Sequence, residues 1–238
     1  MAGHSKWANI KHRKERSDKK KGKIFSRIMK EIISAVKQGG SDLKANAKLK
    51  VAIQKAKDAN IPNDNVERNI KKAASQDSTD YVSMTYELYG FGGVGLIVDI
   101  MTDNKNRISS DIRIATNKCG GTIATPGSVS YNFDRKGVIR VKRTLPEDEL
   151  FLLATEAGAE DFSGEEDVFQ IITTIESFHY IKEILEKAGV IIEEAELAMV
   201  PKIWVEVDDE TADSNITLIE WLESLDDVDA VYHNMKIH

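Results

Sequence analysis

The sequence predicts an α+β protein: a basic three-helix bundle at the N-terminus, then two α+β domains, one ferredoxin-like and inserted into the other. Three observations support this prediction. Apolar residues recur at steps of three and four over residues 22–74, as in amphipathic helices. From residue 84 this period gives way to strand-like alternation. Residues 137–197 then follow the order βαββαβ, which is that of the ferredoxin-like fold.

The N-terminal region contains too few apolar residues at its start to fold alone, so residues 1–21 are predicted to form a basic arm. Helices are predicted over residues 22–39 and about 42–59. A third helix, capped by Asn63 or Asp64, is predicted to end near residue 74. Together they form a predicted helical bundle of residues 22–76.

The remainder of the chain divides into two α+β units. We expect residues 81–134 and 199–238 to form one domain, and residues 135–198 to form the inserted ferredoxin-like domain. In the first domain we predict strands at 84–89, 94–101, 203–207 and 228–234, and helices at 104–118 and 213–222. In the inserted domain we predict strands at 137–143, 159–162, 168–174 and 190–197, and helices at 146–157 and 177–188.

Charge is distributed unevenly along the chain, whose formal net charge is −6. Residues 1–72 hold 20 Lys and Arg against 7 Asp and Glu, a net charge of +13, whereas residues 73–238 carry −19. A basic end on an acidic body is typical of a protein that binds a polyanion at one end.

Several classes of protein are disfavoured by composition. The single cysteine, Cys119, allows neither an intramolecular disulfide nor a cysteine-based metal site, which suits a reducing compartment. The start lacks the apolar region of a signal peptide, and the most apolar stretch, residues 94–101, is too short to span a bilayer. We therefore expect a cytoplasmic protein without a membrane partner.

The basic N-terminal cluster is the candidate nucleic-acid site. Its cations would neutralise phosphates, and Trp7 offers a stacking face for an unpaired base or a wedge for a groove. A solvated charged surface is the alternative, but the density of charge and its contrast with the body favour nucleic acid. The predicted contacts are Lys6, Trp7, Lys11, His12, Arg13, Lys14, Arg16, Lys19, Lys20, Lys21, Lys23, Arg27 and Lys30.

The segment 90–95, GFGGVG, matches the dinucleotide pattern G-x-G-x-x-G. That site needs a helix directly after the glycines, so that its N–H groups meet the pyrophosphate. The residues that follow, LIVDI, are typical of a strand instead. The segment therefore predicts a glycine-rich hairpin, and no cofactor is predicted.

A second anion site is considered at residues 102–107, TDNKNR, where a strand passes into a helix. Free N–H groups at a helix start attract anions, so Lys105, Asn106 and Arg107 are candidates for a secondary phosphate contact. Helix capping by Thr102 or Asp103 is the slightly favoured alternative.

The other chemical groups give no catalytic arrangement. The five histidines lack metal-ligand spacing, and the acidic clusters fall at turns and helix starts, so we predict no metal, no small-molecule substrate and no enzyme. Five aromatic residues suit either an RNA-binding platform or a core, and a core is favoured. They are Tyr86, Tyr89, Phe91, Tyr131 and Phe133.

Seven segments together resemble the YebC family: GHSKWANIKHRK, GKIFSR, NIPNDNVERNIKKA, YELYGFGGVG, TDNKNR, GGTIATPGSVSYNF and DVDAVYHNM. The resemblance implies a bacterial cytoplasmic protein of three domains, one helical and two α+β. Bacterial members are described as DNA-binding transcriptional regulators. The mitochondrial relative is a translational activator for a cytochrome oxidase subunit, and bacterial members are also linked to the relief of ribosomes stalled at proline-rich stretches.

Two functions are therefore expected: a DNA-binding transcriptional regulator of the YebC type or, alternatively, a ribosome-associated translation factor that binds ribosomal or transfer RNA. No helix-turn-helix, zinc finger or basic zipper is identified, so base readout lacks an obvious reader. A basic arm and basic helices suit structured RNA at least as well. An enzyme would need clustered acids or a phosphate loop, neither of which is found, and a pure protein scaffold is the last alternative.

Overall fold

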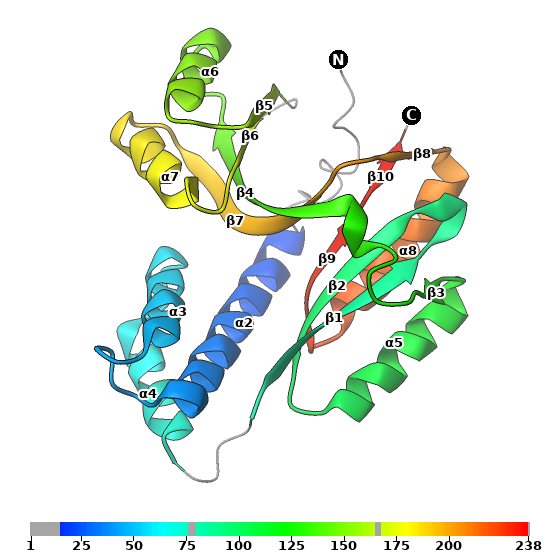
Figure 1. The fold of residues 1–238 in the computed structure, drawn as a ribbon, viewed down its shortest axis with the longest axis horizontal. Coiled ribbons are helices and arrows are strands. Elements are labelled where there is room, and N and C mark those ends of the chain that lie inside the picture. The colour runs from blue at the N-terminus through cyan, green and yellow to red at the C-terminus, as the bar shows by residue number, and fades with distance from the viewer. Residues whose placement is uncertain (1–14, 76–79, 165–167, 238) are drawn as a thin grey trace.

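The computed structural model describes residues 15–75, 80–164 and 168–237, and in residues 15–21 it describes the backbone alone. Helices come first along the chain and mixed helices and strands follow, so the predicted α+β class is confirmed (Figure 1). The strands form two four-stranded sheets and one two-stranded sheet among the described residues.

Three helices form the N-terminal bundle: α2 (Glu15–Gly39), α3 (Ala47–Asp58) and α4 (Asn63–Ala73). The long α2 packs along both of the others, and Ile32, Leu49 and Ala56 lie fully buried between them. The predicted start of the first helix at Gly22 was wrong, because α2 begins at Glu15. Lys, Arg and Glu are good helix formers, so the backbone of residues 15–21 is helical without an apolar period.

The starts of the two shorter helices also differ from the prediction. Asn46 caps α3: its side chain accepts a hydrogen bond from the Leu49 N–H at 3.0 Å and donates to the carbonyls of Ala35 and Gly40, each at 2.8 Å. Pro62 occupies the cap position of α4 and makes no side-chain hydrogen bond there. Its fixed φ suits the entry to a helix.

The first sheet has the order β3-β1-β2-β9. Its strands are β1 (Val82–Tyr89), β2 (Gly95–Thr102), β3 (Thr122–Ile123) and β9 (Val228–His233). Helices α5 (Lys105–Cys119) and α8 (Asp209–Ser224) cover one face, where Leu96, Ile112 and Leu218 are fully buried. A parallel pair, β8 (Val205–Val207) with β10 (Met235–Ile237), lies beside them, and β10 was not predicted.

The glycine-rich hairpin is confirmed. A short 3₁₀ turn at Phe91–Gly93 joins β1 to β2, which pair antiparallel from Tyr89 opposite Gly95. A Cβ at Gly90 would lie 2.1 Å from Asn215 Oδ1, and the Asn215 amide binds both the N–H and the carbonyl of Phe91. The absence of a side chain at position 90 therefore lets the Asn215 side chain lie close to the backbone of the hairpin.

The second sheet has the order β5-β6-β4-β7 with every neighbouring pair antiparallel. Its strands are β4 (Phe133–Lys142), β5 (Asp161–Gly164), β6 (Val168–Thr173) and β7 (Ile192–Pro201). Helices α6 (Glu147–Glu156) and α7 (Phe178–Lys187) pack on one face through Leu150 and Ile181. This is the predicted ferredoxin-like order.

Strands β4 and β7 also connect the two sheets. They pair from Phe133 opposite Pro201 to Val141 opposite Ile192, and their near ends reach the face of the first sheet that α5 and α8 leave open (Figure 1). There Phe133 and Ile97 are buried together, with Met199 and Tyr232 packed against them. The two α+β units therefore share a small apolar contact.

The aromatic residues do not form one group. Phe133 is buried and Tyr86 packs against the first core, whereas Tyr89 and Phe91 are each 39% exposed and Tyr131 is 68% exposed. The core prediction was therefore wrong for Tyr89, Phe91 and Tyr131. Tyr89 is the last residue of β1, and Phe91 and Tyr131 lie in short 3₁₀ turns rather than in strands, so no alternation buries their rings.

Candidate nucleic-acid interface

The predicted contacts fall into three groups. The first group lies outside the described residues: Lys6, Trp7, Lys11, His12, Arg13 and Lys14. The second group lies on the first turns of α2, where the backbone alone is described: Arg16, Lys19, Lys20 and Lys21. The third group is fully described and consists of Lys23, Arg27 and Lys30, which lie at steps of four and three on α2.

Lys23, Arg27 and Lys30 point toward the first sheet and its helix α8 rather than into solvent. The apolar stripe of α2, including Ile28 and Ile32, packs against α3 and α4, and the three cations meet the connection between α8 and β9. We name residues 223–229, which run from the last residues of α8 through this connection to the start of β9, the acidic turn, because they include Glu223, Asp226, Asp227 and Asp229.

Lys23 closes the end of α8. Its ammonium donates to the carbonyl of Glu223, to that of Leu225 at 2.9 Å and to that of Val228 at 3.2 Å. The Glu223 and Leu225 carbonyls lie at the C-terminal end of α8, where helix carbonyls lack partners within the helix, and Val228 is the first residue of β9. Burial lowers the pKa of Lys23, although the carboxylates of Glu223, Asp226 and Asp229 oppose this effect. Lys23 therefore acts as a helix C-cap supplied from another part of the chain.

Lys30 lies seven residues after Lys23 on α2 and also binds the acidic turn. Its Nζ donates to the carbonyl of Met101 at 3.1 Å and to that of Asp226 at 2.9 Å. A carboxylate oxygen of Asp227 lies 3.6 Å away, and the ring of Tyr81 has its centroid 5.7 Å from Nζ. The Lys30 side chain is only 12% exposed.

Arg27 lies between these two lysines. Its Nε is 3.3 Å from Glu31 Oε1 and 3.8 Å from Asp229 Oδ2. Burial opposes the charged guanidinium, but Asp229, Tyr232 and Glu31 outweigh it, so the pKa of Arg27 is raised. The acids around Arg27 therefore satisfy its charge inside the protein.

The second predicted anion site is also occupied by the protein's own groups. The side chain of Asn104 caps α5 by accepting from the N–H groups of Asn106 at 3.1 Å and Arg107 at 3.0 Å. Capping by Thr102 or Asp103 was therefore the wrong assignment. Arg107 Nη2 lies 2.6 Å from both Asp103 Oδ1 and Asp227 Oδ2, and these hydrogen bonds raise its pKa. Lys105 is exposed beside them.

Asp227 connects the two regions. Its carboxylate accepts from Arg107 and, at 2.9 Å, from the Thr102 hydroxyl, and Lys30 lies on its other oxygen. Burial works against the ionised form, but the hydrogen bonds from Arg107 and Thr102 outweigh it and lower the pKa of Asp227. A single carboxylate thus joins α2, β2, α5 and the acidic turn.

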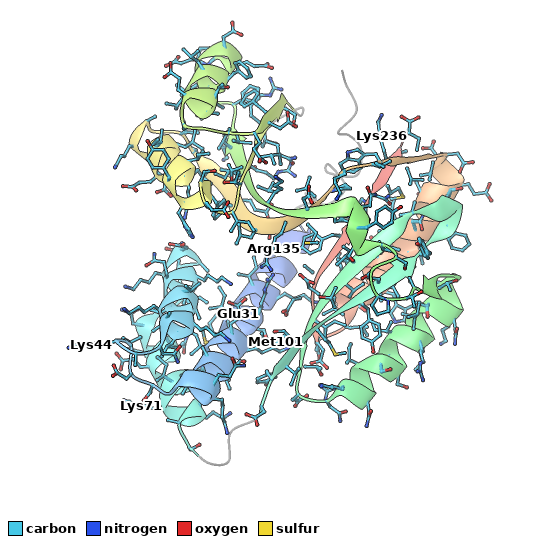
Figure 2. All side chains as sticks on the ribbon, viewed as in Figure 1. Glu31, Lys44, Lys71, Met101, Arg135 and Lys236 are labelled. Atoms are coloured by element: carbon cyan, nitrogen blue, oxygen red, sulfur yellow. The ribbon has the colours of Figure 1, made fainter. Side chains whose placement is uncertain are left out.

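The bundle carries further cations that were not singled out from the sequence. They share exposure on the outer sides of α3, α4 and the turn before α3, and Figure 2 shows Lys44 and Lys71 pointing away from the sheets. Those on the two helices could have been found from their spacing, which is seven residues on α3 and three or four residues on α4, on the sides away from the apolar positions. These residues are Lys44, Lys50, Lys57, Arg68, Lys71 and Lys72.

Two further observations concern only residues 15–75, 80–164 and 168–237. Within these ranges no group of three or more His, Cys, Asp and Glu side chains is arranged to hold a metal ion. Within the same ranges, no helix has the length and apolar character needed to cross a membrane.

Comparison with known proteins covers almost the whole chain. Residues 5–76 match the TACO1/YebC protein N-terminal domain, and residues 81–235 match the TACO1/YebC second and third domain. A protein of Protochlamydia amoebophila named "Probable transcriptional regulatory protein" is 65% identical over 100% of this chain and 97% of its own length.

A protein of the same name from Chlamydia trachomatis serovar L2 is 57% identical over 99% of this chain and 100% of its own length. The crystal structure of a conserved hypothetical protein from Aquifex aeolicus superposes with a TM-score of 0.82 at 43% identity, covering 98% of both chains. The N-terminal bundle and the two α+β units that follow it are thus those of its relatives, and the chain belongs to the TACO1/YebC family.

Proposed function

We propose that this chain is a cytoplasmic nucleic-acid-binding regulator of gene expression without catalytic activity, acting as a DNA-binding transcriptional regulator. The observation that carries the proposal is the concentration of positive charge in the N-terminal region, a net +13 in residues 1–72 on a body of −19. Relatives named transcriptional regulatory proteins support the regulatory part of it.

Two sets of basic residues are proposed to make the contact. They comprise the basic residues from Lys6 to Lys21 and the exposed cations on the outer sides of α3 and α4. Lys23, Arg27, Lys30 and Arg107 have internal partners, so the proposal does not rest on them.

An RNA-binding translation factor that acts at the ribosome is the second candidate. The observation that supports it is the distribution of the remaining cations over three helices: Arg16, Lys19, Lys20 and Lys21 belong to the first turns of α2, and others lie on α3 and α4. Such a spread suits the backbone of a folded RNA as well as that of a duplex.

Ultraviolet crosslinking of the tagged protein in its own cells, with both RNA and DNA sequenced, tests the two candidates. Discrete promoter DNA with little RNA would support the transcriptional regulator. Crosslinks concentrated in ribosomal or transfer RNA would overturn it in favour of the translation factor. Recovery of neither polymer above an untagged control would contradict both.

A further inference from the structure

The helical bundle is joined to the first sheet mainly by charged and polar groups rather than by a shared core. The buried apolar residues of the bundle form one cluster, and those of the sheet with α5 and α8 form another. Between them lie the contacts of Lys23, Arg27 and Lys30 with the acidic turn. On the other side of the bundle, Asp58 of α3 lies 3.6 Å from Lys182 of α7.

Next to these contacts the bundle and the sheet leave an open cleft. It has a volume of about 370 Å³, and its apolar lining comes from Ala35, Val51 and Ala52 on one side and Met101 on the other. Figure 2 places Glu31 and Met101 on its two sides. An interface that is polar on one side and unfilled on the other resembles a transient contact more than a packed core.

The oxygen atoms around the three cations are of the kind that a nucleic-acid backbone presents. Lys23 and Lys30 are surrounded by carbonyl and carboxylate oxygens, and Arg27 faces carboxylates. Phosphate oxygens make the same charge-assisted hydrogen bonds with ammonium and guanidinium groups. The acidic turn thus presents to α2 a negative surface of similar chemistry.

The same face of α2 continues toward the basic N-terminal residues. Positions 16, 20, 23, 27 and 30 are separated by four and three residues, so one face of the continuous helix Glu15–Gly39 contains them all. A polyanion that binds at the start of α2 would follow this face directly into the acidic turn.

We propose that the acidic turn 223–229 is an intramolecular competitor of nucleic acid for the Lys23–Arg27–Lys30 face of α2, so that binding releases the bundle from the first sheet. This proposal rests on the nucleic-acid function proposed above. The closed form hides three cations, and affinity is therefore reduced by the fraction of molecules that are closed. By reciprocity, weakening the closed contact strengthens binding, and binding weakens the closed contact.

The test measures the two events separately in the full-length protein. Spin labels are placed at Ser41→Cys in the bundle and Ser110→Cys in α5, both exposed positions, with Cys119→Ser removing the native thiol. The distance distribution is recorded alone and with a short mixed-sequence DNA duplex or an RNA hairpin. Affinity for the same probes is measured by fluorescence anisotropy. We expect saturating probe to shift the distance distribution of the free protein to longer values and to broaden it.

A matched pair of variants separates the contact from total charge. Asp227→Asn removes the carboxylate that faces Lys30, whereas Asp213→Asn removes one from an exposed position of α8. We expect Asp227→Asn to bind the probe several-fold more tightly and Asp213→Asn to match the parent. Because Asp227→Asn also alters the contacts of Arg107 and Thr102, the probe titration of the parent protein is a second, independent measurement.

Three outcomes would overturn the competition. Probe binding with an unchanged distance distribution would do so and leave the nucleic-acid function standing. Equal gains from both variants would assign the effect to net charge. Failure of either probe to bind the parent and the Asp227→Asn variant would overturn the proposed function together with the competition.

Discussion

The carboxylate of Asp229 lies 3.8 Å from the guanidinium of Arg27, and its side chain is only 10% exposed. Burial raises the pKa of Asp229 to about 6, although Arg27 and Lys30 oppose the rise. Glu31 and Asp99 face the same carboxylate and add to it. The pair therefore has an acid that gains a proton at mildly acidic pH while its partner stays charged.

This relationship predicts a pH-dependent stability. The folded pKa of Asp229 exceeds the ordinary value of 3.8, so the folded state holds this proton more tightly. The resulting stabilisation is fully present below about pH 4 and is lost as pH rises through about 6. We expect the free energy of unfolding of Asp229→Asn, relative to the parent, to rise by up to about 3 kcal/mol across that window. Urea unfolding at several pH values measures it, and parallel curves would contradict it.

The two acidic partners of Arg107 predict unequal effects on stability. Asp227 is 8% exposed and also binds Thr102 and Lys30, so Asp227→Ala leaves buried donors unpaired. Its expected cost is about 2 to 3 kcal/mol. Asp103 is 34% exposed and lies one helical turn from Arg107, so Asp103→Ala should cost below about 0.5 kcal/mol. Urea unfolding at neutral pH compares them, and similar costs would refute the central role of Asp227.

Much of the fold could be predicted because its signals are local. The alternation of apolar residues and the turn residues in 137–197 predicted the βαββαβ order. The strand-like residues after Gly90–Gly95 predicted a hairpin at these glycines. The start of α2 was missed because residues 15–21 contain charged helix formers but no apolar period. Periodicity detects the face that a helix buries, and a charged turn has no such face.

The candidate site was less accessible to sequence reasoning. Lys23 donates to the carbonyl of Glu223, which is 200 positions away in the sequence. Counting charges along the chain cannot detect such a contact, and both charged side chains would be expected in solvent. The basic cluster is visible in the sequence, but the acids that meet Lys23, Arg27 and Lys30 lie in residues 223–229, whose position beside α2 depends on the tertiary fold. The Asn104 cap was missed for a local reason: three adjacent residues, Thr102, Asp103 and Asn104, are all good caps.

Asn46 predicts the stability of the bundle. Its side chain is buried and makes one acceptor and two donor contacts, to Leu49, Ala35 and Gly40. Asn46→Ala should therefore cost about 2 kcal/mol. Asn46→Ser keeps a hydroxyl acceptor that can cap the Leu49 N–H but removes both amide donors, so we expect an unfolding free energy that is lowered but remains above that of Asn46→Ala. Thermal unfolding followed by helical circular dichroism tests the order, and equal destabilisation in both variants would deny the cap a separate contribution.

The salt dependence of binding tests which cations form the interface. Removing one cation that neutralises a phosphate lowers the slope of log affinity against log salt by about 0.9 on duplex DNA. Replacing Lys19, Lys20 and Lys21 with Gln should therefore reduce this slope by about 2 to 3 and weaken binding at low salt. The matched control replaces Lys142, Lys187 and Lys202, which lie outside the bundle, and should leave the slope unchanged.

A third variant, with Arg68, Lys71 and Lys72 replaced by Gln, distinguishes the two faces of the bundle. These residues lie at steps of three and four on α4 and are exposed. A reduced slope in this variant as well would mean that the polymer contacts both α2 and α4, as a folded RNA or a bent duplex can. An unchanged slope would confine the contact to the line of α2. A defined interface releases counterions only where phosphates are bound. Equal reductions of the salt slope in the bundle variants and in the control would therefore show that binding depends only on the net charge of the protein.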